Sequence, residues 1–340
     1  MQTVGMTKAP RRGRLVIDAI DGLDAARREA TKTTTRLAVS RWRPTDPGGF
    51  NVAEIVPERV NSDDVVVYPM SYDYRIDPLI LRRLEVIAAV IHRRILAVET
   101  PGVTIDFANP PQTGRSTVSG RAFWAGLRGD FSALADLQLR ALRETIEFDL
   151  ANVRLLGESL GAQSVMSMAQ SMTPVSIDLI EPVNCRSRGP LALWLSGRSL
   201  SGVEEDLRRR YVERSRERGW NVPEIFEFSS PENGAVDKRL KRFWSQGRWA
   251  VLSALAMANG LGREANSVAN STPVAVWRGA DSTACLVADA SRFVEALAER
   301  GVPAELIDLD MTGMPAGHHL LADLDAATGF ALELTRRWGG

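Results

Sequence analysis

The amino-acid sequence predicts an α/β domain with a mostly parallel central sheet that is flanked by helices. Three observations predict it. Strand and helix patterns alternate from residue 64 to residue 182, the alternation returns at residue 273, and the stretch between shows only helical patterns. Alternating strands and helices are typical of parallel sheets, because a crossover between parallel strands is usually a helix. The stretch between is therefore interpreted as a helical insertion.

The elements before and at the start of the alternation can be placed from their patterns. A short helix is expected at 21–30, followed by strands at 36–42 and 50–60 on either side of the turn-rich segment PTDPGG. The β-branched run DVVVYPMSY at 64–72 is typical of a strand buried on both faces. Pro78 then stands at the first position of a helix whose apolar residues recur every three or four positions.

The later elements follow in the same way. A strand at 95–103 precedes a long loop at 104–129, which is rich in glycine and proline, and an amphipathic helix at 129–152. The remaining expected elements are strand 153–159, helix 160–172, strand 175–182, strand 273–282, helix 290–301, strand 304–311 and helix 320–338.

The domain boundaries follow from these changes of pattern. Residues 1–14 are interpreted as a disordered basic tail, and residues 15–184 together with 271–340 as the α/β core. Residues 185–270 form the insertion, which is rich in Arg and Glu and is expected to be a helical cap or lid. Within it, Lys238–Trp249 is interpreted as an amphipathic lid helix rather than a nucleic-acid site, because its aromatic residues have helical spacing.

The composition excludes several functional classes. Of 340 residues, 44% are hydrophobic, and the 42 basic side chains balance 42 acidic ones, so nothing attracts the chain globally to nucleic acid or anionic membranes. Cys185 and Cys285 form neither a disulfide framework nor a zinc spacing, so a reducing, cytoplasmic compartment is expected. No apolar run reaches the about 20 residues that span a bilayer, and the N-terminus lacks the apolar region of a secretory signal.

The motif GESLG places Ser159 between Gly157 and Gly161, with a strand pattern before it and a helix pattern after it. This spacing suits a sharp strand-to-helix turn in which a side chain at either glycine would collide with its surroundings. A serine hydroxyl becomes a nucleophile when a histidine accepts its proton and a carboxylate orients that histidine.

The chain has three histidines, and two of them lie where such a partner is needed. His92 lies within a helical pattern and is interpreted as a surface or packing residue. His318 and His319 follow a predicted strand, and Asp281 ends another, so all three belong to the strand ends that converge on the sites of parallel sheets. The order serine, acid, histidine along the chain is characteristic of one fold.

These motifs together resemble the α/β-hydrolase family. The resemblance rests on VVVYPMSYD, GESLG, VAVWRGADS and AGHHLL in this order, and it places the insertion where many members carry a cap. It implies that Ser159 attacks an acyl carbon, that His318 transfers the proton and that Asp281 holds the imidazole. The family usually places its histidine directly after a glycine, which favours His318, while His319 is the alternative base or a loop residue at the site entrance.

The resemblance also implies an oxyanion hole. Its donors would be the backbone N–H of Leu160 and an N–H near Met70 or Ser71. This chain departs from the family here, because Pro69-Met70 stands where many members carry His-Gly. Glu158, just before the serine, would adjust polarity or serve packing.

Three other carboxylates are alternatives to Asp281, because each also lies at a strand end: Asp308, Asp310 and Glu181. Three tryptophans of the insertion, with Phe243 beside one of them, suggest an apolar acyl pocket or the packing of the lid: Trp194, Trp244 and Trp249.

The function predicted from sequence is therefore a serine hydrolase that cleaves a carboxylic ester or a related acyl bond through an acyl-enzyme. Its partner is a small-molecule acyl ester. No metal or other cofactor and no nucleic acid is implied, and nothing indicates an oligomer. Thioester, lactone and amide substrates stay open. The alternative is a catalytically idle α/β-hydrolase fold that serves as a structural or interaction component, since a fold does not guarantee an activity.

Overall fold

The computed structural model describes most of the α/β core and parts of the insertion, chiefly residues 206–223 and 260–270. The described residues are 11–42, 50–70, 76, 78–100, 124–125, 128–183, 185–186, 203, 206–223 and 260–339. The lid helix expected at Lys238–Trp249 and most of the loop expected at 104–129 lie outside them.

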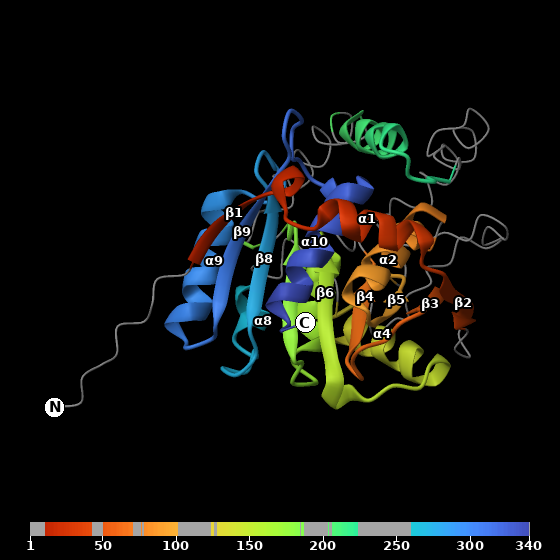
Figure 1. The fold of residues 1–340 in the computed structure, drawn as a ribbon. Coiled ribbons are helices and arrows are strands. Elements are labelled where there is room, and N and C mark those ends of the chain that lie inside the picture. The colour runs from red at the N-terminus through yellow and green to blue at the C-terminus, as the bar shows by residue number, and fades with distance from the viewer. Residues whose placement is uncertain are drawn as a thin grey trace, which may run out of the picture.

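One sheet runs through the molecule (Figure 1). Its strands are β1 (Arg11–Val16), β2 (Thr35–Trp42), β3 (Phe50–Pro57), β4 (Val65–Pro69), β5 (Arg94–Val98), β6 (Val153–Glu158), β7 (Ser176–Ile180), β8 (Val274–Gly279) and β9 (Ala304–Asp310). The nine strands follow the spatial order β1-β9-β8-β7-β6-β4-β5-β3-β2. Every neighbouring pair is parallel except β5 with β3 and β3 with β2, so the predicted mostly parallel sheet is confirmed.

Helices cover both faces of this sheet, as predicted. They are α1 (Leu23–Lys32), α2 (Pro78–Ile91), α4 (Ser132–Thr145), α5 (Gly161–Met168), α8 (Gly262–Ala265), α9 (Val287–Glu299) and α10 (Leu324–Arg337), with single turns η1 (Ile17–Ala19), η2 (Leu150–Asn152) and η3 (Leu320–Ala322). Side chains of α1, α2 and α10 pack in one apolar core, and those of α4, α5 and α9 pack in another. Strand β4 lies between the cores: Val66 and Tyr68 belong to the first, and Val65 and Val67 to the second. This explains why its sequence is a continuous apolar run.

The N-terminal region differs from the expected tail. Residues 1–10 lie outside the described part of the chain, but Arg11–Val16 form β1, which pairs in parallel with β9. The Nε of Arg14 donates to Asp310 Oδ2 at 2.8 Å. Edge strands often carry charged side chains, and RRGRLV has three arginines and no alternating apolar pattern that would reveal the strand.

Several helices are shorter than their sequence patterns, among them α5, which ends at Met168 instead of residue 172. The helix expected at 129–152 ends at Thr145, and Asp149 begins the separate turn η2 by accepting the Ala151 N–H at 2.9 Å. The C-terminal helix begins at Leu324, because the Asp323 carboxylate accepts the Ala326 N–H at 2.8 Å and caps it. Aspartate favours such positions because its side chain satisfies backbone donors that a helix leaves open.

Part of the insertion is described as a helical segment at 206–217, shown in green at the top of Figure 1. Within it, Tyr211 and Val212 are buried against the same core as α10. No helix among the described residues is long and apolar enough to cross a membrane.

Candidate active site

The turn that carries Ser159 has the geometry expected for it. Strand β6 ends at Glu158 and α5 begins at Gly161, and Ser159 has a φ of 54°, which is strained for a residue other than glycine. A Cβ on Gly157 would lie 2.6 Å from the Gly161 carbonyl oxygen, and a Cβ on Gly161 would overlap the carbonyl oxygen of Pro69 in β4. The steric reason predicted for both glycines is therefore confirmed.

Ser159 and His318 lie together at this turn. His318 Nε2 is 3.2 Å from Ser159 Oγ, although the two residues are 159 positions apart in the sequence. Both side chains are buried, with 8% and 6% of each residue exposed. His318 comes from the loop between β9 and η3, so the loop that was predicted to meet the serine does so.

The carboxylate on the far side of the imidazole is that of Glu181, not of Asp281. Glu181 Oε2 lies 3.2 Å from His318 Nδ1, and the same carboxylate accepts the Gly279 N–H and the Ser282 hydroxyl. Glu181 follows β7 directly and has a φ of 48°. Since β7 lies between β6 and β8 in the sheet, its end is nearer to Ser159 than the end of β8 that carries Asp281.

Asp281 has a different place, which corrects the prediction from sequence. Its N–H donates to the Ala316 carbonyl at 3.0 Å, and its carboxylate faces the Ala316 N–H at 3.4 Å. Asp281 therefore supports the loop that leads to His318 and does not face the imidazole.

The other alternative acids have structural partners. Asp308 Oδ1 accepts from Arg278 Nη1 at 2.7 Å, and Asp310 pairs with Arg14 at the edge of the sheet. His92 lies at the end of α2, where its Nε2 is 3.9 Å from Glu29 Oε1. These contacts show that all three residues have partners elsewhere and do not belong to the serine turn.

The expected oxyanion donors have three different outcomes. The Leu160 N–H follows Ser159 at the start of α5, where helix geometry leaves the N–H groups without intrahelical acceptors, and no acceptor for it occurs among the described residues. The Met70 N–H donates to the Val98 carbonyl at 2.8 Å, which corrects its assignment because pairing between β4 and β5 continues past β4. Ser71 lies outside the described residues.

Glu158 belongs to a buried charged group beneath the serine turn. Its Oε2 accepts the Tyr68 hydroxyl at 2.6 Å and lies 2.8 Å from Arg83 Nη2, which also donates to the Tyr68 oxygen at 2.6 Å. Burial alone would raise the pKa of Glu158, but the Arg83 charge and contacts from His319 and Tyr68 hold it well below its usual range. The carboxylate is therefore charged, and Tyr68 and Arg83 hold it through Oε2.

His319 faces this frame and not the serine. Its Nδ1 lies 3.6 Å from Glu158 Oε1, and its ring packs edge-on against His318 with centroids 4.0 Å apart. Burial, and secondarily the neighbouring His318, lower the pKa of His319 to about 3. The ring is therefore neutral at physiological pH, and the histidine that contacts Ser159 is His318.

Among the described residues, no group of three or more His, Cys, Asp and Glu side chains is arranged to hold a metal ion. The site consists of organic side chains and backbone groups at the C-terminal ends of parallel strands, where ligands bind in open α/β sheets.

Solved structures with a similar architecture are enzymes. Carboxyl esterase 2 from the mycorrhizal fungus Tuber melanosporum matches over 96% of this chain and 89% of its own, with a TM-score of 0.50 and 13% identity. Bromoperoxidase from Bacillus anthracis matches over 88% of this chain and 100% of its own, with a TM-score of 0.49 and 12% identity. No protein-family model and no curated protein matches the chain. At this identity the similarity shows the fold alone, and that fold is the predicted α/β-hydrolase fold.

Proposed function

We propose that this α/β-hydrolase-fold protein is a serine hydrolase that cleaves a carboxylic ester or a related acyl bond. The observation that carries the proposal is the continuous line of contacts from Ser159 Oγ through the His318 imidazole to the Glu181 carboxylate. A serine hydroxyl, an imidazole and a buried carboxylate that contact one another in this spatial order form the arrangement that activates a serine as a nucleophile.

In the first half of the reaction, Ser159 Oγ attacks the acyl carbon while its proton passes to His318 Nε2. A bond forms between Oγ and carbon, and the carbonyl π electrons move to the oxygen. Glu181 accepts the Nδ1–H of the resulting imidazolium and stabilises its charge. The Leu160 N–H, at the positive end of α5, then donates to the oxyanion.

In the second half, the bond to the leaving group breaks and the leaving oxygen takes the proton from His318 Nε2. A water molecule then gives a proton to His318 and attacks the acyl carbon. The bond between carbon and Oγ breaks as Oγ takes that proton from Nε2, which releases the acid and restores Ser159. This chemistry needs protein groups and water only.

The substrate class rests on two considerations. The same three side chains would cleave esters, thioesters, lactones and amides, so the chemistry alone does not separate them. The name of carboxyl esterase 2, which shares the fold, favours a carboxylic ester. A small-molecule acyl ester is therefore the proposed partner.

The test is covalent labelling of Ser159 with a fluorophosphonate probe, followed by mass spectrometry of the labelled peptide. Wild-type protein should label at Ser159 and hydrolyse a short p-nitrophenyl ester, and Ser159→Ala should do neither. Ser132→Ala is the matched control, since among the described residues that hydroxyl donates to Asp130 at the start of α4. A folded wild-type protein that neither labels nor turns over would contradict the proposal and favour the catalytically idle alternative.

A further inference from the structure

The loop that carries His318 is fastened by a side chain from the insertion. Tyr211, in the helical segment 206–217, donates its hydroxyl proton to the Pro315 carbonyl at 2.9 Å. The same oxygen accepts the Gly317 N–H at 2.9 Å. Tyr211 is fully buried, so one hydroxyl bridges both peptide groups on either side of Ala316 without competition from water.

The opposite side of this loop is held by the core. Asp281 binds both the N–H and the carbonyl of Ala316, and a Cβ on Gly279 would overlap the Ala316 oxygen. The core therefore engages the middle of the turn, while Tyr211 engages the residues before and after it. His318 follows directly, so its backbone position depends on both supports.

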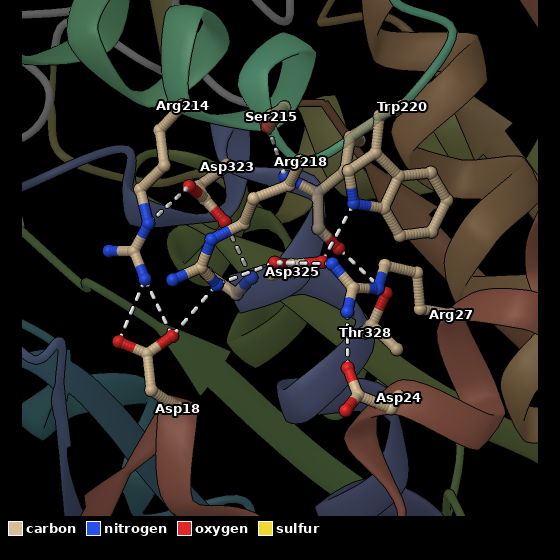
Figure 2. A network of polar contacts seen from close by, with 12 residues as sticks. Asp18, Asp24, Arg27, Arg214, Ser215, Arg218, Trp220, Asp323, Asp325 and Thr328 are labelled. Atoms are coloured by element: carbon tan, nitrogen blue, oxygen red, sulfur yellow. Dashed lines mark hydrogen bonds and ion pairs between the residues drawn. The ribbon is translucent and has the colours of Figure 1, made fainter.

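The segment that presents Tyr211 is itself docked by charged side chains, which are partly buried except for the buried Asp325. Figure 2 shows Arg214 and Arg218 reaching Asp18 of η1 and Asp325 of α10. Arg218 Nη1 lies 2.6 Å from Asp325 Oδ2, and Trp220 Nε1 donates to Asp325 Oδ1 at 2.7 Å. Arg214 Nη2 lies 2.7 Å from Asp18 Oδ2. This docking network fixes the helix that carries Tyr211 to two elements of the core.

We propose that Tyr211 is a positioning residue through which the docking of the insertion sets the position of His318. The proposal rests on the proposed hydrolase function and extends it, because it makes the base dependent on a segment outside the α/β core. An undocked segment would leave Pro315 and Gly317 without their partners, and the imidazole would lose its alignment with Ser159. Misplacement of a catalytic group by about 1 Å lowers rates by about a hundredfold.

The chain offers a matched pair of variants for the test. Tyr211→Phe removes only the hydroxyl that holds the loop. Ser215→Ala removes a hydroxyl of the same helical segment that accepts the Leu324 N–H at 2.9 Å and donates to the Tyr211 carbonyl at 3.0 Å. It leaves the contacts of Arg214, Arg218 and Trp220 in place, so the segment stays docked. Both side chains are fully buried, and each hydroxyl makes two hydrogen bonds, so each variant loses two. Only the bonds of Tyr211 reach the loop before His318.

Five quantities would be measured in each variant: kcat and KM for a p-nitrophenyl ester, the rate of fluorophosphonate labelling, hydrogen exchange of the peptide that contains Gly317, and the thermal midpoint of unfolding. Tyr211→Phe should lower kcat and the labelling rate about tenfold or more with KM little changed, because alignment and not binding is lost. Exchange at Gly317 should become faster. Ser215→Ala should lower the thermal midpoint while kcat and Gly317 exchange stay close to wild type.

Equal losses of kcat in both variants, or a wild-type rate in Tyr211→Phe, would overturn the positioning role. Unchanged Gly317 exchange in Tyr211→Phe would overturn it even if wild-type protein never labelled with the probe. Failure of the wild-type protein to label, with faster Gly317 exchange in Tyr211→Phe, would instead count against the hydrolase function and support the structural coupling.

Discussion

Two buried glutamates flank the serine turn, and their surroundings differ. Glu158 and Glu181 are 0% and 1% exposed, and each lies at the end of a parallel strand. Glu158 is paired with the Arg83 guanidinium, which neutralises its charge. Glu181 accepts hydrogen bonds from the Gly279 N–H and the Ser282 hydroxyl and faces His318 Nδ1. No Lys or Arg among the described residues forms an ion pair with it.

This difference separates a structural carboxylate from one that can serve chemistry. A carboxylate already paired with a guanidinium gains little from a second cation. A buried carboxylate held only by neutral donors keeps its charge available for an imidazolium that forms during a reaction. The partners of each glutamate, rather than its burial, therefore indicate its role.

The largest expected effect tests the two histidines that face these two glutamates. His318→Ala should lower kcat by about 10⁶-fold, because the serine loses its base. His319→Ala should leave kcat far closer to wild type, since its Nδ1 faces Glu158 and not Ser159. Steady-state kinetics with a p-nitrophenyl ester measure both, and equal or reversed losses would contradict the assignment of the base.

The next effect distinguishes the two acids. Glu181→Gln should lower kcat by about 10⁴-fold, because the amide cannot stabilise the imidazolium or fix its tautomer in the same way. Asp281→Asn should retain most of the activity, since an amide oxygen can still accept the Ala316 N–H. The same assay decides the matter, and a larger loss in Asp281→Asn would restore the acid expected from sequence.

A third prediction concerns the stability of the Glu158 frame. Arg83→Met should lower the free energy of unfolding by about 3–5 kcal/mol, because it leaves a buried carboxylate without its cation. Arg94→Met is the control, since its ion pair with Glu54 is more exposed and should contribute about 1 kcal/mol or less. Urea denaturation of each variant gives the comparison, and similar losses in both would mean that burial does not set the cost.

The smallest effect is a pH dependence of stability. The pKa of His319 is about 3 in the folded protein, below its ordinary value, so the unfolded chain binds the proton first as the pH falls. The stability from the neutral ring is therefore complete above about pH 6.5 and is lost toward pH 3, at up to about 1.4 kcal/mol per pH unit.

His319→Asn should flatten this slope between pH 7 and pH 5, a window that lies above the titration of ordinary carboxylates. His92→Asn should keep it. Urea midpoints at the two pH values measure the slope, and a wild-type slope in His319→Asn would show that other groups carry it.

The sequence predicted the parts of the site that depend on local geometry. Gly157 and Gly161 indicate a turn in which no larger side chain fits. A histidine after a strand lies close to the serine because the ends of parallel strands converge. The order of serine, acid and histidine, however, is the same for Glu181 and Asp281. Which acid faces the ring depends on the spatial order of β7 and β8, and that order cannot be predicted from local patterns in a single sequence.

Other differences also arise from tertiary contacts. The Met70 N–H is engaged because pairing with β5 extends past the end of β4, which no local pattern reveals. Tyr211 reads as one more apolar position on an amphipathic helix, and its link to Gly317 appears only when the insertion docks on the core. Strand β1 is rich in arginine and has no apolar alternation, so only its pairing with β9 reveals it.

Both edges of the sheet come from the beginning of the chain. Strands β1 and β2 lie at opposite ends of the strand order, and α1 connects them across the face formed with α2 and α10. During synthesis, β1 leaves the ribosome long before β9, its neighbour among the described strands, so this pair forms only after β9 has been made. Removal of the residues up to Val16 would leave the backbone of β9 open to pairing with another chain, and self-association of such a truncated protein would follow from that exposed edge.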